Sequence, residues 1–126
     1  MPPEKKILII DDDKDLTDIL EDRLTQAGFL VTVEYNGEDG LKTALSKKPD
    51  LILLDVKMPK MTGIDMFEKL RTDEWGKTAV VMFLTVMDQP EILSRAIELG
   101  GYEYLVKTDW KIEEVVERIK RKLESP

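Results

Sequence analysis

The sequence predicts an α/β fold in which a parallel sheet of five strands is flanked on both faces by five helices. Short apolar segments alternate five times with segments in which apolar residues recur at helical spacing. Three of the short segments are apolar throughout, which is typical of parallel strands buried on both faces. Strands that alternate with helices build right-handed βαβ units and hence a doubly wound sheet.

The first part of the chain contains three strands and two helices. Strands are expected over Ile7 to Ile10, Phe29 to Tyr35 and Leu51 to Leu54. The helix after the first strand ends near Gly28, and its inward residues are Leu16, Ile19, Leu20 and Leu24. Asn36 is a suitable N-cap for the next helix, which buries Leu41, Ala44 and Leu45.

The remainder of the chain continues the alternation. A loop follows the third strand, and the next helix faces inward with Ile64, Phe67 and Leu70. Val80 to Leu84 forms the fourth strand, and Asp88 with Glu91 is a capping pair for a helix that buries Ile92, Ala96 and Leu99. The fifth strand, Tyr102 to Val106, precedes a helix capped by Asp109, with Ile112, Val115, Val116, Ile119 and Leu123 inward.

The composition indicates one ordinary globular domain and excludes several classes of function. The 126 residues, 42% hydrophobic and 36% charged, suit a single domain, which we expect over residues 4–124. Cysteine and histidine are absent, so thiolate metal sites and imidazole catalysis are excluded within this chain. The net charge of −7 argues against direct nucleic-acid binding. Every apolar stretch is too short for a membrane span or signal peptide, and we expect a cytoplasmic protein.

Polar side chains stand where four of the predicted strands end. Asp11 and Asp12 follow the first strand, Asp55 the third, Thr85 the fourth and Lys107 the fifth. The carboxyl ends of parallel strands share one edge of the sheet, and ligands of open α/β sheets bind at that edge. We therefore expect these five side chains to lie near one another.

Each of these residues also has a purely structural interpretation. Asp12 or Asp13 can cap the first helix, and Asp55 can open a turn. Thr85 suits any strand through its β-propensity, and Lys107 can extend its amine to water. Because four separate strands end in polar side chains at the same edge of the sheet, the combination favours a functional site.

Such a set of side chains suits a divalent cation and a phosphoryl group. Crowded carboxylates repel one another, and a hard cation such as Mg²⁺ relieves the repulsion while keeping waters and phosphate oxygens as further ligands. Asp55 stands alone on the middle strand, so its carboxylate is the expected nucleophile. The Thr85 hydroxyl and the Lys107 amine would contact the oxygens of the transferring group.

These residues resemble the receiver domain of two-component response regulators. The resemblance extends from about Lys5 to Leu123. It is carried by the acidic pair, the acceptor aspartate with the loop that follows, the threonine and the lysine: Ile9-Ile10-Asp11-Asp12, Asp55, Met58-Pro59, Met61, Gly63, Thr85 and Lys107. It implies a flavodoxin-like sheet with the strand order 2-1-3-4-5.

The resemblance also implies a phosphorylation site and a metal site. A histidine kinase or a phosphotransfer protein would donate its phosphoryl group to Asp55. Asp11, Asp12 and Asp55 would hold Mg²⁺ together with the backbone carbonyl of Lys57. In the family these groups serve self-directed phosphotransfer, so the protein would be a signalling switch.

The switch implied by the resemblance consists of Thr85 and Tyr104. Phosphorylation would draw the Thr85 hydroxyl inward, and Tyr104 would rotate into the vacated space. This would reshape the face formed by the helix around Ile92 to Leu99, the last strand and the last helix, where a downstream protein partner would bind. The protein would be a monomer or a phosphorylation-dependent dimer.

A few positions depart from the family pattern. Thr108 stands directly after the lysine, where the family usually has proline, and Val86 stands directly after the threonine, where a small residue is usual. Lys57 and Met87 flank the expected path of the hydrolytic water, and neither is a good general base near neutral pH. We therefore expect slow autodephosphorylation.

The leading hypothesis is a signalling switch rather than an enzyme. We expect no output domain after Leu123, so signalling would pass through a partner; in the alternative that the chain is a fragment of a longer regulator, Glu124-Ser125-Pro126 would begin a linker. A phosphohydrolase of the haloacid dehalogenase type is a second alternative, but that class needs an aspartate where Lys57 stands. A receiver-like scaffold that docks partners without phosphorylation is a third, favoured by Val86 and Thr108.

Overall fold

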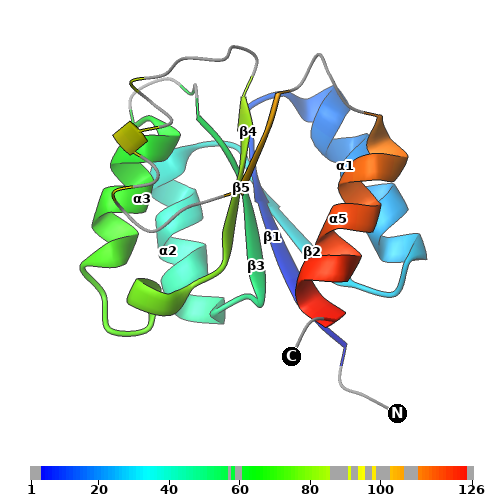
Figure 1. The fold of residues 1–126 in the computed structure, drawn as a ribbon, viewed down its shortest axis with the longest axis horizontal. Coiled ribbons are helices and arrows are strands. Elements are labelled where there is room, and N and C mark those ends of the chain that lie inside the picture. The colour runs from blue at the N-terminus through cyan, green and yellow to red at the C-terminus, as the bar shows by residue number, and fades with distance from the viewer. Residues whose placement is uncertain are drawn as a thin grey trace.

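A five-stranded parallel sheet forms the centre of the computed structural model, in the order β2-β1-β3-β4-β5 (Figure 1). The structure describes residues 4–56, 58, 61–85, 91, 94, 95, 98, 103–106 and 111–124, with the backbone alone at residues 85 and 103–106. The strands are β1 (Lys6–Ile10), β2 (Leu30–Glu34), β3 (Leu51–Asp55), β4 (Val81–Thr85) and β5 (Glu103–Val106). The predicted class and the flavodoxin-like strand order are confirmed, although β2 is one residue shorter at each end than predicted and β4 begins and ends one residue later.

Helices cover both faces of this sheet, with α1 and α5 on one face and α2 and α3 on the other (Figure 1). Their bounds are α1 (Lys14–Gln26), α2 (Gly37–Lys47), α3 (Gly63–Arg71) and α5 (Ile112–Glu124), with a short 3₁₀ helix η1 (Gly76–Thr78) before β4. The predicted fourth helix is described only at residues 91, 94, 95 and 98, all helical. Its predicted cap Asp88 and the predicted cap Asp109 lie outside the described residues. None of the helices in the described part of the chain has the length and apolar character needed to cross a bilayer.

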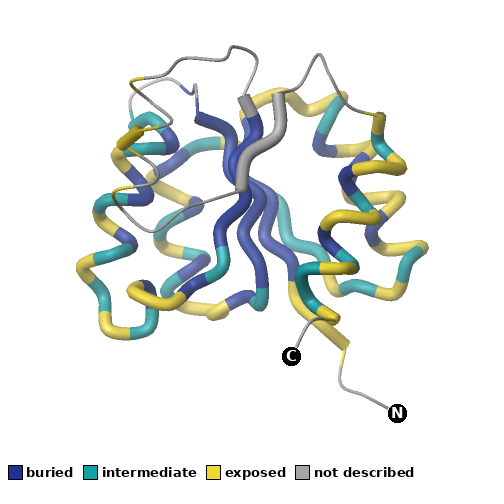
Figure 2. The backbone as a smooth tube through the Cα atoms, viewed as in Figure 1, coloured by how far each residue is buried: buried dark blue, intermediate teal, exposed yellow. Residues whose placement is uncertain are grey.

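Two apolar layers hold the helices against the sheet, because successive strand residues point to opposite faces. On the α2 and α3 side the core contains Leu8, Ile10, Ile52, Leu54, Phe67 and Phe83. On the α1 and α5 side it contains Ile7, Ile9, Leu51, Leu53, Leu20 and Ile119. β3 is buried at every position, whereas the edge strand β2 is partly exposed along its length (Figure 2). Burial on both faces is the reason why the central strands are apolar throughout.

Side-chain caps fix the starts of three helices at the carboxyl edge of the sheet. Asn36 accepts a 2.8 Å hydrogen bond from the backbone N–H three residues further on, as predicted for α2. Of the two aspartates able to cap α1, Asp13 is the N-cap. Thr62 and Asp65 form a reciprocal capping box at α3. At the opposite edge α1 is followed by Gly28, whose φ of +100° lies in the region that glycine adopts without a steric penalty.

One predicted inward residue of α1 is wrong. Ile19 is 48% exposed, and Thr17 is fully buried in its place. Each residue advances a helix by about 100°, so Ile19 lies well away from the face that carries Leu20 and Leu24, which Thr17 shares. The Thr17 hydroxyl donates a 3.0 Å hydrogen bond to the Lys14 carbonyl, which compensates its burial.

Candidate metal and phosphoacceptor site

Three aspartates from two neighbouring strands meet at the carboxyl edge of the sheet. Asp11 and Asp12 directly follow β1, and Asp55 is the last residue of β3. β1 and β3 pair in parallel with Ile10 beside Leu54, so Asp11 and Asp55 come next to each other. One carboxylate oxygen of each aspartate lies within 4.8 Å of the other two. Asp11 and Asp55 are 0% and 3% exposed, whereas Asp12 is open to solvent. Two members of the cluster are therefore buried, and the third can be reached from solvent.

Contacts from β2 and from the start of α1 orient Asp11. Its backbone N–H donates a 3.1 Å hydrogen bond to the Glu34 carbonyl at the end of β2. Its Oδ1 accepts a 3.0 Å hydrogen bond from the backbone N–H of Asp13. The Glu34 carboxylate in turn accepts a hydrogen bond from the Thr43 hydroxyl of α2. Asp11 is thus held by the end of β2 and by the residue that caps α1.

Asp55 is held between β4 and the start of α3. It pairs with Leu84 in the sheet, and the N–H of Val56 donates a 3.0 Å hydrogen bond to the Leu84 carbonyl. The N–H of Gly63, the first residue of α3, donates a 2.9 Å hydrogen bond to the Val56 carbonyl. A Cβ atom at Gly63 would lie 2.1 Å from the Asp55 carbonyl oxygen. The sequence analysis placed Gly63 only in a family motif; the available signal for this close approach was a glycine that opens a helix shortly after the strand that ends in Asp55.

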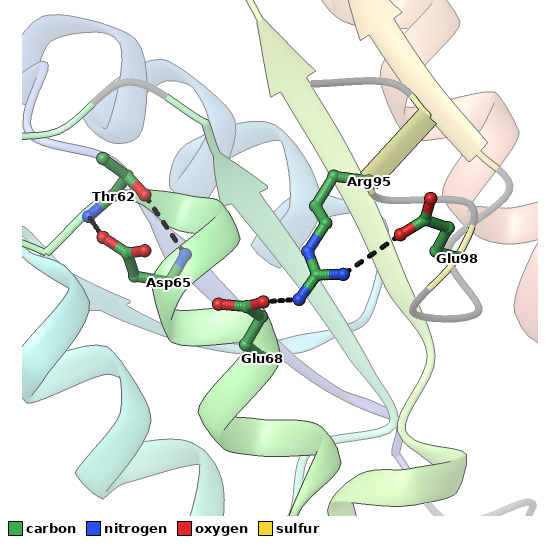
Figure 3. Close-up of polar contacts among 5 residues, drawn as sticks. All are labelled: Thr62, Asp65, Glu68, Arg95 and Glu98. Atoms are coloured by element: carbon green, nitrogen blue, oxygen red, sulfur yellow. Dashed lines mark hydrogen bonds and ion pairs between the residues drawn. The ribbon is translucent and has the colours of Figure 1, made fainter. Parts of the chain in front are cut away.

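Ion pairs connect α3 with the helical residues that follow β4 (Figure 3). Glu68, one turn beyond the capping box, pairs with Arg95. Arg95 also contacts Glu98, with 3.0 Å between Nη1 and Oε2. The Arg95 and Glu68 side chains are 46% and 38% exposed, so solvent screens this network. The helix that begins beside Asp55 therefore also contacts the segment between β4 and β5.

The ends of β4 and β5 lie at the same edge of the sheet. Thr85 is the last residue of β4 and pairs with Val106, the last residue of β5. Tyr104 pairs with Phe83 in the same ladder. Lys107 comes directly after Val106 in the chain. Lys107 lies outside the described residues, as do the predicted positions Lys57, Pro59, Val86, Met87, Ile92, Ala96, Leu99, Tyr102 and Thr108.

The chain was compared with known protein families. A model of the response regulator receiver domain matches residues 7–120. The chain belongs to this family. The resemblance inferred from the acidic pair, Asp55, Thr85 and Lys107 is therefore confirmed. Phosphorylation and dependence on magnesium are general properties of receiver domains.

The receiver domain is similar to the corresponding part of longer proteins. It is 41% identical over 115 residues to the transcriptional regulatory protein CpxR of Klebsiella pneumoniae, a match that covers 91% of this chain and 47% of the relative. It is 36% identical over 103 residues to the alkaline phosphatase synthesis transcriptional regulatory protein PhoP of Bacillus subtilis, covering 82% of this chain and 42% of the relative. The chain thus spans less than half the length of these two relatives.

Solved structures of receiver domains have the same fold. The CheY-like receiver domain protein of Methanospirillum hungatei superposes with a TM-score of 0.88 at 27% identity, covering 97% of this chain and 95% of that one. Chemotaxis protein CheY4 of Vibrio cholerae superposes with a TM-score of 0.87 at 27% identity, covering 94% and 98%. Each of these matches covers nearly all of both chains.

The donor set of this receiver domain suits magnesium. All three side chains of the cluster are carboxylates, and Mg²⁺ prefers hard oxygen ligands. Three such groups within 4.8 Å, two of them buried, repel one another strongly when all are ionised. A divalent cation at the cluster would offset that repulsion.

Proposed function

We propose that this receiver domain is a phospho-accepting switch of a two-component phosphorelay, with Asp55 as the acceptor. The observation that carries the proposal is the acidic cluster, because it places the carboxylate of Asp55 beside those of Asp11 and Asp12 at the edge of a receiver fold. The donor is a histidine kinase or a phosphotransfer protein. The only chemistry of the domain is its own phosphorylation and its slow autodephosphorylation.

The transfer is a displacement at phosphorus. A carboxylate oxygen of Asp55 forms a bond to the phosphorus atom while the bond from phosphorus to the donor histidine nitrogen breaks. That nitrogen keeps the electron pair, and the released imidazole takes up a proton. With acetyl phosphate as the donor, the phosphorus–oxygen bond breaks instead and acetate leaves.

The residues around Asp55 have distinct roles in this proposal. Asp11, Asp12 and Asp55 would hold Mg²⁺ with the backbone carbonyl of Lys57, and the bound metal would neutralise charge on the carboxylates and the phosphoryl oxygens. The burial of Asp11 and Asp55 supports this arrangement, since it keeps competing water from most of the acceptor. Thr85 and Lys107 supply a hydroxyl and an amine to the phosphoryl oxygens.

The signal leaves through a protein partner in this proposal. Thr85 and Tyr104 are the switch pair, on adjacent strands β4 and β5. Their rearrangement alters the face formed by the segment around residues 91–98, β5 and α5, to which a downstream protein binds. No direct contact with nucleic acid is needed, in agreement with the net charge of −7.

Intact-mass measurement after incubation with acetyl phosphate tests the proposal. We expect one added phosphoryl group in the presence of Mg²⁺, and none without the metal or in an Asp55→Ala variant. Asp55→Asn serves as a second control that preserves the volume of the side chain. If neither acetyl phosphate nor a kinase preparation modified the native protein, the scaffold that docks partners without phosphorylation would replace this proposal.

A further inference from the structure

Asp13 lies between the metal-binding cluster and the first helix and makes three hydrogen bonds with different neighbours. We infer that Asp13 is a positioning residue for the Asp11 carboxylate, and that its helix cap tunes the affinity for Mg²⁺. The inference rests on the proposed function, because it concerns how tightly the acidic cluster holds its cation.

The contacts of Asp13 join Asp11 to the start of α1. Its N–H donates a 3.0 Å hydrogen bond to Oδ1 of Asp11. Its own Oδ1 accepts a 3.2 Å hydrogen bond from the N–H of Leu16, and its carbonyl accepts a 3.0 Å bond from the N–H of Thr17. The side chain and the backbone of Asp13 thus connect the start of α1 with the buried carboxylate of Asp11.

The side-chain cap determines where the Asp13 N–H points. An N-cap residue holds an extended backbone outside the helix, and here φ is −86° and ψ is 101°. In this conformation the N–H is directed at Asp11 rather than along the helix axis. Without the cap the backbone of residue 13 samples other conformations, and the Asp11 carboxylate loses a donor that fixes its rotation before metal arrives.

The consequence for binding follows from pre-organisation. A site whose ligand is already oriented binds its cation more tightly than one that must be ordered during binding. Removing an N-cap side chain costs about 1 kcal/mol of stability. If all of that free energy were lost from metal binding, the Mg²⁺ affinity would fall about fivefold, which is the largest effect expected. The substitution leaves Asp11, Asp12 and Asp55 intact, so some binding is retained.

The Asp13 carboxylate could also act simply as a further negative charge near the cation. Asp13→Asn separates the two explanations, because asparagine is an equally good cap but carries no charge. The control is Asn36→Ala, which removes the cap of α2, a bond of 2.8 Å, on the same edge of the sheet. Both alanine variants lose a cap, but only one of them alters the residue that contacts Asp11.

Calorimetric titration with MgCl₂ at constant ionic strength, combined with thermal unfolding, tests the inference. We expect Asp13→Ala to bind Mg²⁺ roughly threefold to fivefold more weakly than the native protein, with Asp13→Asn and Asn36→Ala close to native. Both alanine variants should unfold at lower temperature than the native protein without metal. Native affinity in Asp13→Ala, or equal weakening in Asp13→Ala and Asp13→Asn, would overturn the inference. A native protein that neither binds Mg²⁺ nor accepts a phosphoryl group would overturn the proposed function instead.

Discussion

Gly63 lies against Asp55 so closely that a side chain at position 63 would overlap the acceptor backbone. A Cβ atom there would be 2.1 Å from the Asp55 carbonyl oxygen and 2.9 Å from the Cα atom of Val56. The N–H of Gly63 also donates a hydrogen bond to the Val56 carbonyl. The start of α3 and the end of β3 therefore form one unit, and any displacement of the helix also displaces the residue that bears the acceptor carboxylate.

A Gly63→Ala substitution should lower both stability and the rate of phosphorylation. Because the contacts are with backbone atoms, which shift only with the strand, we expect a loss of about 2–3 kcal/mol in the free energy of unfolding by urea. The rate of adduct formation with acetyl phosphate should fall. Gly28→Ala is the control. The alanine there would be strained by a φ of +100°, but its Cβ atom would have no other atom within 4 Å. It should lose about 1–2 kcal/mol with an unchanged phosphorylation rate.

Neutralising Asp12 should stabilise the metal-free protein. One carboxylate oxygen of Asp12 lies within 4.8 Å of oxygens on Asp11 and Asp55, so the carboxylates repel one another when they are ionised. We expect Asp12→Asn to raise the metal-free midpoint of thermal unfolding by about 3 °C at low salt and to reduce the further rise produced by millimolar Mg²⁺. A lower metal-free midpoint in this variant would contradict the repulsion.

The ion pair between Glu68 and Arg95 should contribute little to stability and should depend on salt. Both side chains are more than one-third exposed, at 38% and 46%. A double-mutant cycle with Glu68→Gln and Arg95→Gln is expected to give a coupling energy of about 0.5–1 kcal/mol that decreases in 0.5 M salt. The pair of Glu74 and Lys77, whose side chains are 93% and 60% exposed, provides the comparison and should show no measurable coupling.

Arg71 should stabilise the segment between α3 and β4 in a way that lysine does not reproduce. Its Nη1 donates hydrogen bonds to the carbonyls of Gly76 and Ala79, the latter at 2.9 Å. Its guanidinium carbon lies 4.4 Å from the ring centroid of Phe67. We expect Arg71→Ala to cost about 2 kcal/mol in urea unfolding, and Arg71→Lys to cost more than half of that, because an ammonium group lacks the planar fork. Full recovery with lysine would show that only the charge matters.

The aspartyl phosphate should be long-lived. The resemblance to receiver domains implies that Lys57 and Met87 flank the path of the hydrolytic water, and neither is a good general base near neutral pH. We expect Lys57→Asn and Met87→Glu variants to lose the phosphoryl group faster than the native protein, as followed by intact mass after the donor is removed. Decay that is fastest in the native protein would refute this explanation.

Much of the site follows from the order of apolar runs in the sequence. Ile7 to Ile10 and Leu51 to Leu54 read as buried parallel strands because each is apolar throughout, and the residues that follow must then share one edge. The structure brings Asp11, Asp12 and Asp55 together there. The cap Asn36 could be predicted equally well, because its hydrogen bond joins residues only three positions apart in the sequence.

Features that depend on the packing of distant segments could not be predicted from the sequence in this way. Helical spacing admits Ile19 and Leu20 alike, and only the direction from which the sheet approaches α1 decides that Thr17 is buried instead of Ile19. The contact between Gly63 and Asp55 depends on the path of the loop after β3. The bond from the Asp13 N–H to Asp11 depends on a backbone angle, which the presence of three consecutive aspartates does not reveal.

β3 carries the acceptor on a strand with no exposed position: all five of its residues, Leu51–Asp55, are buried. A substitution at any of its four apolar residues disturbs one of the two apolar layers, since Leu51 and Leu53 lie in one layer and Ile52 and Leu54 in the other. Exposed positions on the helices carry no such constraint, so a change of surface chemistry there leaves the packing around Asp55 intact.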